Sequence, residues 1–347
     1  MPHIPQRKFD YYPKAVYLAL MVRRLLQAIH DSSKIDDKDY YGNKRLESAG
    51  QLMSLLFEDK FKMFNSELKS ELDKLFSKSK RPDNLKTEII QIFEKNSGGF
   101  TKGIMSTVSS GNWNLKRFKM ERAGVTQVLS RLSYIQSLGM MTRITSQVEK
   151  TRKISGPRAL QGSHWGIICP SDTPDGESCG LQKHLALLTY ITTDQDKHKI
   201  LKIVILLGVE DIGLVNGEEI HSGNNYIVFL NGQIAGLHRN PSKFTKDFRE
   251  LRRKGIINEF VSISQDSNKK CITIAFDYGR LTRPLIIVEN GFPKVQPHHL
   301  LKLKEKKMNF NDFIKEGLIE YLDVNEEDNC LIALIEKDVI IIFFLFF

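Results

Sequence analysis

The chain has 347 residues, of which 41% are hydrophobic and 27% charged, an ordinary balance for a soluble globular protein with two or three domains. Its formal net charge of +10 favours an anionic partner, nucleic acid first and an acidic membrane surface second. Four cysteines, and an N-terminus without the apolar run that secretion requires, argue against a secreted, disulfide-rich protein, so a reducing intracellular compartment is expected.

Apolar residues recur at helical intervals through most of the first 140 residues. The third helix that this pattern predicts would begin after Asp83, a plausible N-cap, and stop at the pair Gly98 and Gly99. The polar, basic and turn-rich segment 139–157 is expected to form a long loop. Helices are therefore predicted over 15–29, 44–76, 83–96 and 125–138.

Beyond Gly180, segments rich in β-branched and aromatic residues predict strands. The pair Asn231-Gly232 is typical of a two-residue hairpin turn. A helix is predicted over 242–255 and another helical segment over about 298–321. Strands are predicted within 202–208, 225–238, 258–265 and 269–290. A helical half followed by a β-rich half indicates an α+β, multidomain chain.

The last nine residues, Val339 to Phe347, are all apolar. This run is too short to span a bilayer as a helix, which needs about 20 residues. As a free tail it would favour aggregation. It is either a buried strand or an artefact where the chain stops short of its natural continuation, and we favour the artefact.

The stretch GSHWGIICPSDTPDGESCG, residues 162–180, joins the two halves and allows three interpretations. A zinc site is disfavoured, because Cys169 and Cys179 lack paired spacing and only His164 could join them. A reactive thiol is disfavoured too, because no nucleophile signature surrounds either cysteine. A closely specified backbone is favoured, since prolines fix φ and glycines allow φ values that other residues rarely adopt, at set positions along the stretch. These residues are Gly166, Pro170, Pro174, Gly176 and Gly180.

The side chains of this loop and its flanks suggest what it presents. Asp172, Thr173 and Asp175 are turn residues that can bond local amides, so a rigid loop could present one or two carboxylates. Two basic clusters flank it, and although a charge run is usually a solvated face, the pair favours a phosphate-binding surface. The clusters are Lys116, Arg117, Lys119 and Arg122, and Arg143, Lys150, Arg152, Lys153 and Arg158.

Motifs of a self-contained catalytic site are absent from the sequence. It has no GxxxxGK[ST] phosphate loop, no GxSxG elbow and no HExxH pair. It also shows no tight group of carboxylates suited to metal-assisted phosphoryl transfer. The sequence therefore predicts no catalytic residue in this chain.

The block 122–194, which contains LSYIQSLGMMTRI and CPSDTPDG, closely resembles the second-largest, β-like subunit of multisubunit DNA-directed RNA polymerases. DDKDYYGNKRLESAGQL at 36–52 and EYLDVNEED at 320–328 are similar to other blocks of the same subunit, in the same order. LSYIQSLGMMTRI and INEFVSIS look most like the nuclear RNA polymerase III version. The resemblance covers about 15–335 and implies an interior piece of that subunit.

The resemblance implies a division of the chain into domains. Residues 1–36 would form the helical end of a lobe or protrusion, 37–188 a fork-like region, 189–260 a β-rich domain like external 1, and 261–335 a domain like external 2. The apolar tail, 336–347, departs from the family.

The resemblance also implies site residues. The loop would lie near the active centre and bind no metal, and Asp175 replaces the glutamate that the family usually carries. Gln127 matches a glutamine that approaches the RNA strand of the hybrid, and Arg143 and Arg158 match arginines of the fork and of the region beside the transcription bubble. The phosphate contacts expected in the fork loop are Lys150, Arg152 and Lys153, and the active-centre loop is Asp172, Thr173, Pro174, Asp175 and Gly176.

The family polymerises ribonucleotides with two magnesium ions, and its metal-binding aspartates sit on the largest subunit. The resemblance therefore implies Mg²⁺ in the assembled enzyme, no metal site in this chain, and an isolated chain without polymerase activity. Expected partners are the DNA template, the RNA transcript, and the largest and other polymerase subunits, in the nucleus and with no membrane. The alternatives are a stand-alone, non-catalytic nucleic-acid-binding protein derived from such a fragment, and a truncated gene model.

Overall fold

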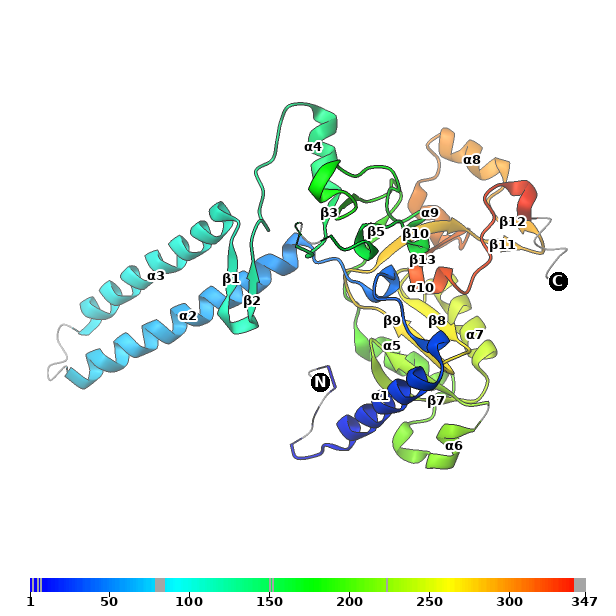
Figure 1. Ribbon diagram of the computed structural model, residues 1–347, viewed down its shortest axis with the longest axis horizontal. Helices are drawn as coiled ribbons and strands as arrows, with labels where there is room; N and C mark the ends of the chain where they lie inside the picture. The colour runs from blue at the N-terminus through cyan, green and yellow to red at the C-terminus, as the bar shows by residue number, and fades with distance from the viewer. Residues whose placement is uncertain are drawn as a thin grey trace. The chain divides into compact units, whose positions relative to one another are not determined.

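A computed structural model describes residues 1–339 of the chain, apart from 2, 5, 7, 79–84, 150, 152 and 223. The chain divides into two compact units, one of Glu47–Thr142 and one that combines Met1–Leu46 with Arg143–Phe347 (Figure 1). Helices and several small, mostly antiparallel sheets occur together, so the predicted α+β class is confirmed. The residues of the apolar tail from 340 onward lie outside the described residues.

Two long helices, α2 (Ala49–Lys78) and α3 (Leu85–Ser110), lie side by side in the unit Glu47–Thr142 (Figure 1). Phenylalanine rings from both helices contact one another, and the centroids of Phe57 and Phe100 are 5.8 Å apart in an edge-on arrangement. The helix predicted over 44–76 is confirmed from Ala49 onward.

A short hairpin of β1 (Trp113–Leu115) and β2 (Met120–Arg122) completes the core of this unit. Its side chains Trp113 and Leu115 are buried together with Leu56 of α2. The two strands thereby bury part of the apolar surface of α2.

The predicted stop of the third helix at Gly98 and Gly99 is wrong. α3 continues through both glycines, and the cost of about 1 kcal/mol for each glycine in a helix is offset by packing against α2. The helix ends before Gly111, whose φ of +71° is the left-handed conformation typical of a residue that follows a helix. The predicted N-cap, Asp83, lies outside the described residues.

The helix predicted over 125–138 is wrong in its first part. Residues 125–132 are irregular, and α4 (Tyr134–Met141) begins later. Ser133 is its N-cap, since its Oγ accepts a hydrogen bond from the backbone N–H of Gln136 at 3.1 Å. A serine that can cap a helix in this way favours the helix start over the helix interior.

A four-stranded sheet lies at the centre of the second unit. Across the sheet its strands are β7 (Gln233–His238), β6 (Tyr226–Leu230), β9 (Cys271–Ala275) and β8 (Ser262–Asp266). Strand β6 pairs antiparallel with β7 and parallel with β9. Asn231 and Gly232 join β6 to β7 with φ of +45° and +78°, which confirms the predicted two-residue hairpin.

Helices cover both faces of this sheet (Figure 1). Successive side chains of a strand point to opposite sides, and here the apolar side chains on each side pack against helices. These helices are α1 (Tyr12–His30), α5 (Lys197–Leu206), α6 (Gly217–His221) and α7 (Pro241–Arg253). Val228 and Leu230 of β6 pack with residues of α5 and α7 in one core. Ile227 and Phe229 pack with residues of α1 and α6 in another.

The predicted helices over 15–29 and 242–255 are confirmed as α1 and α7, but the strand predicted within 202–208 is wrong. Most of that segment belongs to α5, where the Asp196 carboxylate accepts a hydrogen bond from the His198 N–H at 2.9 Å. A short apolar run cannot distinguish a buried strand from a buried helix. The capping aspartate is therefore the signal that decides for the helix.

A second sheet has the order β13-β10-β5. Its strands are β5 (Tyr190–Ile191), β10 (Leu281–Ile286) and β13 (Ile319–Asp323). The segment 298–321, predicted to be helical, contains helices but enters β13 at its end, so that part is wrong. The remaining elements of this region are β11 (Val288–Glu289), β12 (Phe292–Pro293), α8 (Pro297–Lys304), α9 (Phe310–Lys315) and α10 (Val324–Glu327).

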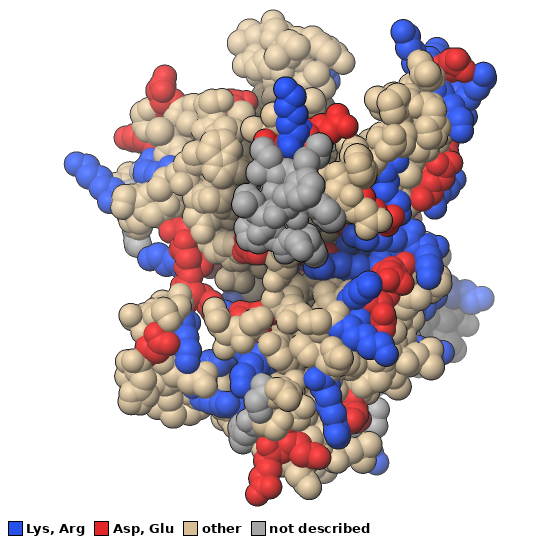
Figure 2. Space-filling view, turned by 90° about the vertical axis from the view of Figure 1, so that its right-hand side faces the viewer, with Lys and Arg blue, Asp and Glu red and all other residues tan. Residues whose placement is uncertain are grey.

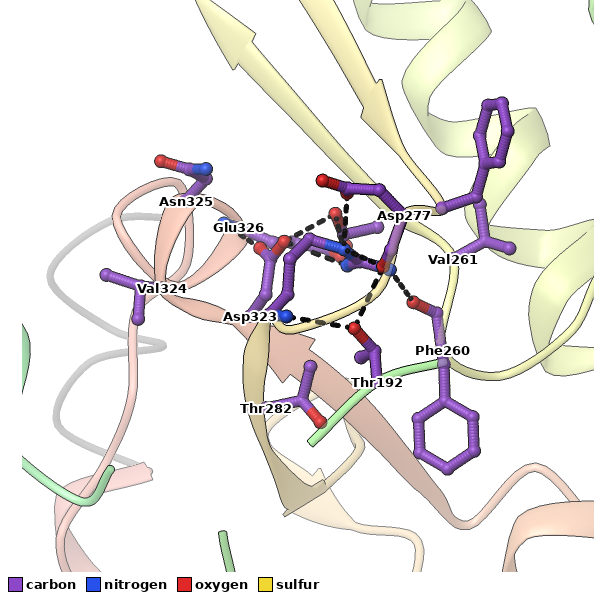
Figure 3. A network of polar contacts seen from close by, with 12 residues as sticks. Thr192, Phe260, Val261, Asp277, Thr282, Asp323, Val324, Asn325 and Glu326 are labelled. Carbon is purple, nitrogen blue, oxygen red and sulfur yellow. Dashed lines mark hydrogen bonds and ion pairs between the residues drawn. The ribbon is translucent and has the colours of Figure 1, made fainter. Parts of the chain in front are cut away.

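A buried polar network connects the two sheets (Figure 3). The Arg280 guanidinium lies 3.1 Å from the Asp323 carboxylate and donates to the Phe260 carbonyl at 2.7 Å. The backbone N–H of Arg280 donates to the Thr192 hydroxyl at 3.1 Å. Arg280 and Asp323 are almost fully buried, and Asp323 and Asp277, whose Oδ1 lies 3.1 Å from Nε of Arg280, compensate the charge of the guanidinium.

No helix within the described part of the chain combines the length and the apolar character needed to cross a membrane.

Candidate nucleic-acid interface

The predicted loop sits on a two-stranded ladder formed by β3 (Arg143–Thr145) and β4 (Gln182–His184). Strand β3 interrupts the long loop predicted over 139–157, so that prediction is wrong in part. The ladder places Arg143 opposite His184. The Cys169 N–H donates to the His184 carbonyl at 2.9 Å, which returns the loop to β4.

The backbone of the loop has the conformations that its glycines predict. Gly166, Gly176 and Gly180 adopt φ of +74°, +82° and +72°. The backbone of Arg158 also lies so close to Gly180 that a Cβ added there would be 2.6 Å from the Cα of Arg158. Glycine is therefore required at Gly180 both by conformation and by space.

The Thr173 side chain links the loop to residues 180 and 182, where the chain enters β4. Its Oγ1 donates to the Gln182 carbonyl at 2.9 Å and accepts from the Gly180 N–H at 2.9 Å. Asp175 precedes the 3₁₀ helix Gly176–Ser178, makes no capping bond to it and is exposed. The loop thus presents the Asp175 carboxylate to solvent on a closely held backbone.

Asp172 lies near β4 instead of capping a local amide. Its Oδ2 is 3.6 Å from Nδ1 of His184, a residue that is largely buried. Pro174 is half-buried between Thr173 and Asp175. Of the three predicted turn side chains, Thr173 is the one that bonds a local amide in the contacts described above.

Arg158 points its guanidinium at the loop. It ends the 3₁₀ helix Gly156–Arg158, and its Nη1 donates to the carbonyls of Glu177 at 2.7 Å and of Cys179 at 2.9 Å. A charged donor shared by two carbonyls holds the second half of the loop firmly. This intramolecular role was not anticipated from the sequence.

A buried charged side chain of strand β4 itself was also missed. Lys183 is 8% exposed, and its Nζ donates to the Pro157 carbonyl at 2.9 Å. Burial lowers the pKa of its ammonium group, and the charge of Lys44 lowers it further. His164 is buried beside Tyr41 with ring centroids 4.5 Å apart, and burial, with help from both lysines, lowers its pKa to about 4. The only signal was the block DYYGNK, which the resemblance noted without assigning roles.

The other predicted contacts are distributed over both units. Arg143 is half-buried, and its Nε has no hydrogen-bond partner in the described structure. Lys153 is exposed, whereas Lys150 and Arg152 lie outside the described residues. Gln127 belongs to the unit of α2 and α3, is exposed, and donates to the Gly124 carbonyl at 3.3 Å.

The arrangement around β4 therefore brings together Arg143, Arg158 and the loop Asp172–Gly176. Lysine and arginine are interspersed with aspartate and glutamate on the face drawn in Figure 2. The net charge of +10 is thus not a uniform basic surface on that face. The described residues contain no group of three or more histidine, cysteine, aspartate and glutamate side chains suited to a metal ion. The arrangement of Arg143, Arg158 and the loop around β4 can therefore position charged groups of a partner.

Comparisons with known proteins give a consistent result. Four domain families match in order along the chain, described as RNA polymerase Rpb2, domain 2 (1–47), domain 3 (127–191), domain 4 (228–289) and domain 5 (310–340). The DNA-directed RNA polymerase III subunit RPC2 of Schizosaccharomyces pombe is 53% identical over 339 residues, which are 98% of this chain and 29% of that protein. The chain belongs to the family of second-largest RNA polymerase subunits.

Other members of the family show which branch is most similar. The RPC2 subunit of Saccharomyces cerevisiae is 52% identical over 97% of this chain and 29% of its own length. The DNA-directed RNA polymerase II subunit 2 of Arabidopsis thaliana is 32% identical over 98% of this chain and 28% of its own length. The resemblance to the polymerase III version is thereby confirmed. The chain spans somewhat less than a third of the length of these relatives.

Proposed function

We propose that this chain is part of the second-largest subunit of a DNA-dependent RNA polymerase of the polymerase III type. In that role it holds the DNA template and the RNA–DNA hybrid near the active centre during transcription. The observation that carries the proposal is the similarity to polymerase III subunits along nearly the whole chain. The partners would be the largest and other polymerase subunits, the DNA template and the RNA transcript, in the nucleus.

The chemistry of nucleotide addition would come from Mg²⁺ bound mainly by the largest subunit. The residues of this chain would act by position and charge. The held loop Asp172–Gly176 would lie near the active centre, and its exposed Asp175 would face that neighbourhood. On this proposal the isolated chain performs no templated RNA synthesis.

The domain boundaries implied by the resemblance are part of the proposal. They are a lobe- or protrusion-like segment over 1–36, a fork-like region over 37–188, an external 1-like domain over 189–260 and an external 2-like domain over 261–335. Gln127 would approach the RNA strand, and Arg143, Lys153 and the neighbouring Lys150 and Arg152 would contact phosphates. Arg158 would lie beside the transcription bubble while it holds the loop.

The salt dependence of scaffold binding tests these phosphate contacts. Polymerase that contains the complete subunit with Lys153→Ala should bind a DNA–RNA bubble scaffold with a log–log salt slope reduced by about one. Lys315→Ala is the matched control, because Lys315 is an equally charged side chain that is 78% exposed on α9. Equal slopes for the two variants would contradict the contact. Tight binding of the scaffold by the isolated chain alone would favour the stand-alone binding protein.

A further inference from the structure

The segment 37–46, called the strap below, contacts Gln161 and Ser163, at the start of the stretch 162–180, and extends from there to the second sheet. Near its start, the Gln161 side-chain amide donates to the Asp37 carboxylate at 2.8 Å. In its middle, the Tyr41 N–H donates to the Ser163 hydroxyl at 3.2 Å. At its end, the Leu46 N–H donates to the carbonyl of Gly279, just before β10, at 2.7 Å. The strap is therefore held at several points within one compact unit.

The Tyr41 ring is the centre of the contacts between the strap and β4. The ammonium nitrogens of Lys44 and Lys183 lie 4.9 Å and 5.7 Å from its centroid, both within the range of a cation–π contact. His164 packs edge-on against the same ring. The ring is half-buried, and burial raises the pKa of its hydroxyl to about 12, so Tyr41 stays neutral.

Lys183 links the Tyr41 ring to the residues that hold the active-centre loop. Its Nζ donates to the Pro157 carbonyl, in the same 3₁₀ turn as Arg158. Arg158 in turn holds the carbonyls of Glu177 and Cys179. A continuous set of contacts thus runs from the strap to the second half of the loop.

We propose that Tyr41 is a positioning residue, whose ring holds the Lys183 ammonium against the Pro157 carbonyl and so sets the Arg158 turn and the loop Asp172–Gly176. That this loop serves an RNA polymerase rests on the proposed function, but the set of contacts does not. Lys183 as a residue is only 8% exposed, so its ammonium group has little water to stabilise it, and the ring face and the carbonyl together favour the observed side-chain position. Without the ring, Lys183 would leave the turn for solvent.

Amide hydrogen exchange of the chain itself tests the contacts. Tyr41→Leu and Lys183→Met should each speed the exchange of the Gly180 and Leu181 amides by about fivefold or more, because the second half of the loop opens more often. Tyr41→Phe keeps the ring and should stay within about twofold of the unsubstituted chain. Lys44→Met is the matched control, since Lys44 lies over the same ring but its side chain is 39% exposed and its Nζ is 3.8 Å from the Asp39 carboxylate. It should also stay within about twofold.

A double substitution separates one shared path from two independent effects. If Tyr41 acts through Lys183, the Tyr41→Leu/Lys183→Met chain should exchange no faster than either single variant. Multiplied effects, unchanged exchange in Tyr41→Leu, or equal effects of Lys44→Met and Lys183→Met would each overturn the positioning role. These outcomes hold whether or not the chain belongs to a working polymerase.

Single-nucleotide extension by the assembled polymerase then tests the consequence for function. With the complete subunit carrying Tyr41→Leu, kcat should fall by roughly fivefold while scaffold affinity stays constant, and Tyr41→Phe should restore kcat. Loss of scaffold affinity with constant kcat would overturn the link to the loop. Failure of the unsubstituted enzyme to extend RNA would count against the proposed function instead, and the exchange result would still decide the positioning role.

Discussion

Gly180 and Gly176 differ in what surrounds them, although both adopt positive φ. A Cβ at Gly180 would overlap the backbone of Arg158, whereas a Cβ at Gly176 would meet nothing within 4 Å. The overlap involves backbone atoms, which cannot rotate away. The pair therefore separates conformational strain from close approach.

Gly176→Ala should lower the free energy of unfolding by about 1 kcal/mol, the cost of a left-handed conformation for an alanine. Gly180→Ala adds the overlap with Arg158 and should cost about 3 kcal/mol. Urea unfolding of the two variants, followed by circular dichroism, gives the comparison. Equal losses would show that the close approach is relieved without cost.

His164 makes stability depend on pH. Its pKa in the folded chain is about 4, below the ordinary value of 6.5, because burial and the charges of Lys183 and Lys44 disfavour the imidazolium, although Asp39 opposes them. Between pH 6.5 and about 4 the unfolded chain binds a proton here that the folded chain does not. This contribution to stability is therefore complete above pH 6.5 and is lost as the pH falls toward 4.

His164→Phe keeps a ring against Tyr41 and removes the titration. Relative to this variant, the unsubstituted chain should lose on the order of 2 kcal/mol of unfolding free energy between pH 6.5 and 4. Unfolding curves collected at several pH values measure the difference. Parallel pH profiles for the two chains would contradict a buried neutral imidazole.

At the scale of elements, the Arg280–Asp323 pair holds β10 against β13 and against the segment before β8. Arg280→Met leaves a buried carboxylate unpaired and should lower the free energy of unfolding by about 3–5 kcal/mol. Adding Asp323→Asn removes that charge while keeping an acceptor for the Glu326 N–H, so the double variant should recover part of the loss. Thermal unfolding compares them, with Lys315→Met as an exposed control that should not change stability measurably. A double variant no more stable than Arg280→Met would contradict the charge argument.

The elements also show where local sequence signals suffice. The Asn231-Gly232 hairpin follows from two residues whose conformations are intrinsic, so it could be predicted. The continuation of α3 through Gly98 and Gly99 could not, because packing against α2 outweighs local propensity. The apolar run of α5 is ambiguous by itself.

In the candidate site, too, local features could be predicted from the sequence, whereas contacts between distant residues could not. The positive φ values in the loop could be anticipated, because glycine adopts them at no steric cost, as it does at Gly166, Gly176 and Gly180. Burial of Lys183 could not, because the Tyr41 ring, 5.7 Å from its Nζ, comes from a distant part of the chain. The bonds from Arg158 to the loop carbonyls were missed for the same reason, since a charge in a sequence carries no information about its partner.

At the scale of the whole molecule, the central claim is that this chain works as part of a large RNA polymerase. Gel filtration of nuclear extract, with an immunoblot of each fraction against the peptide Gly162–Gly180, tests it most directly when the same fractions are assayed for DNA-templated RNA synthesis. The account predicts that the immunoreactive band elutes with a very large complex, in the fractions that synthesise RNA. A band that elutes alone, in fractions without templated synthesis, would contradict it.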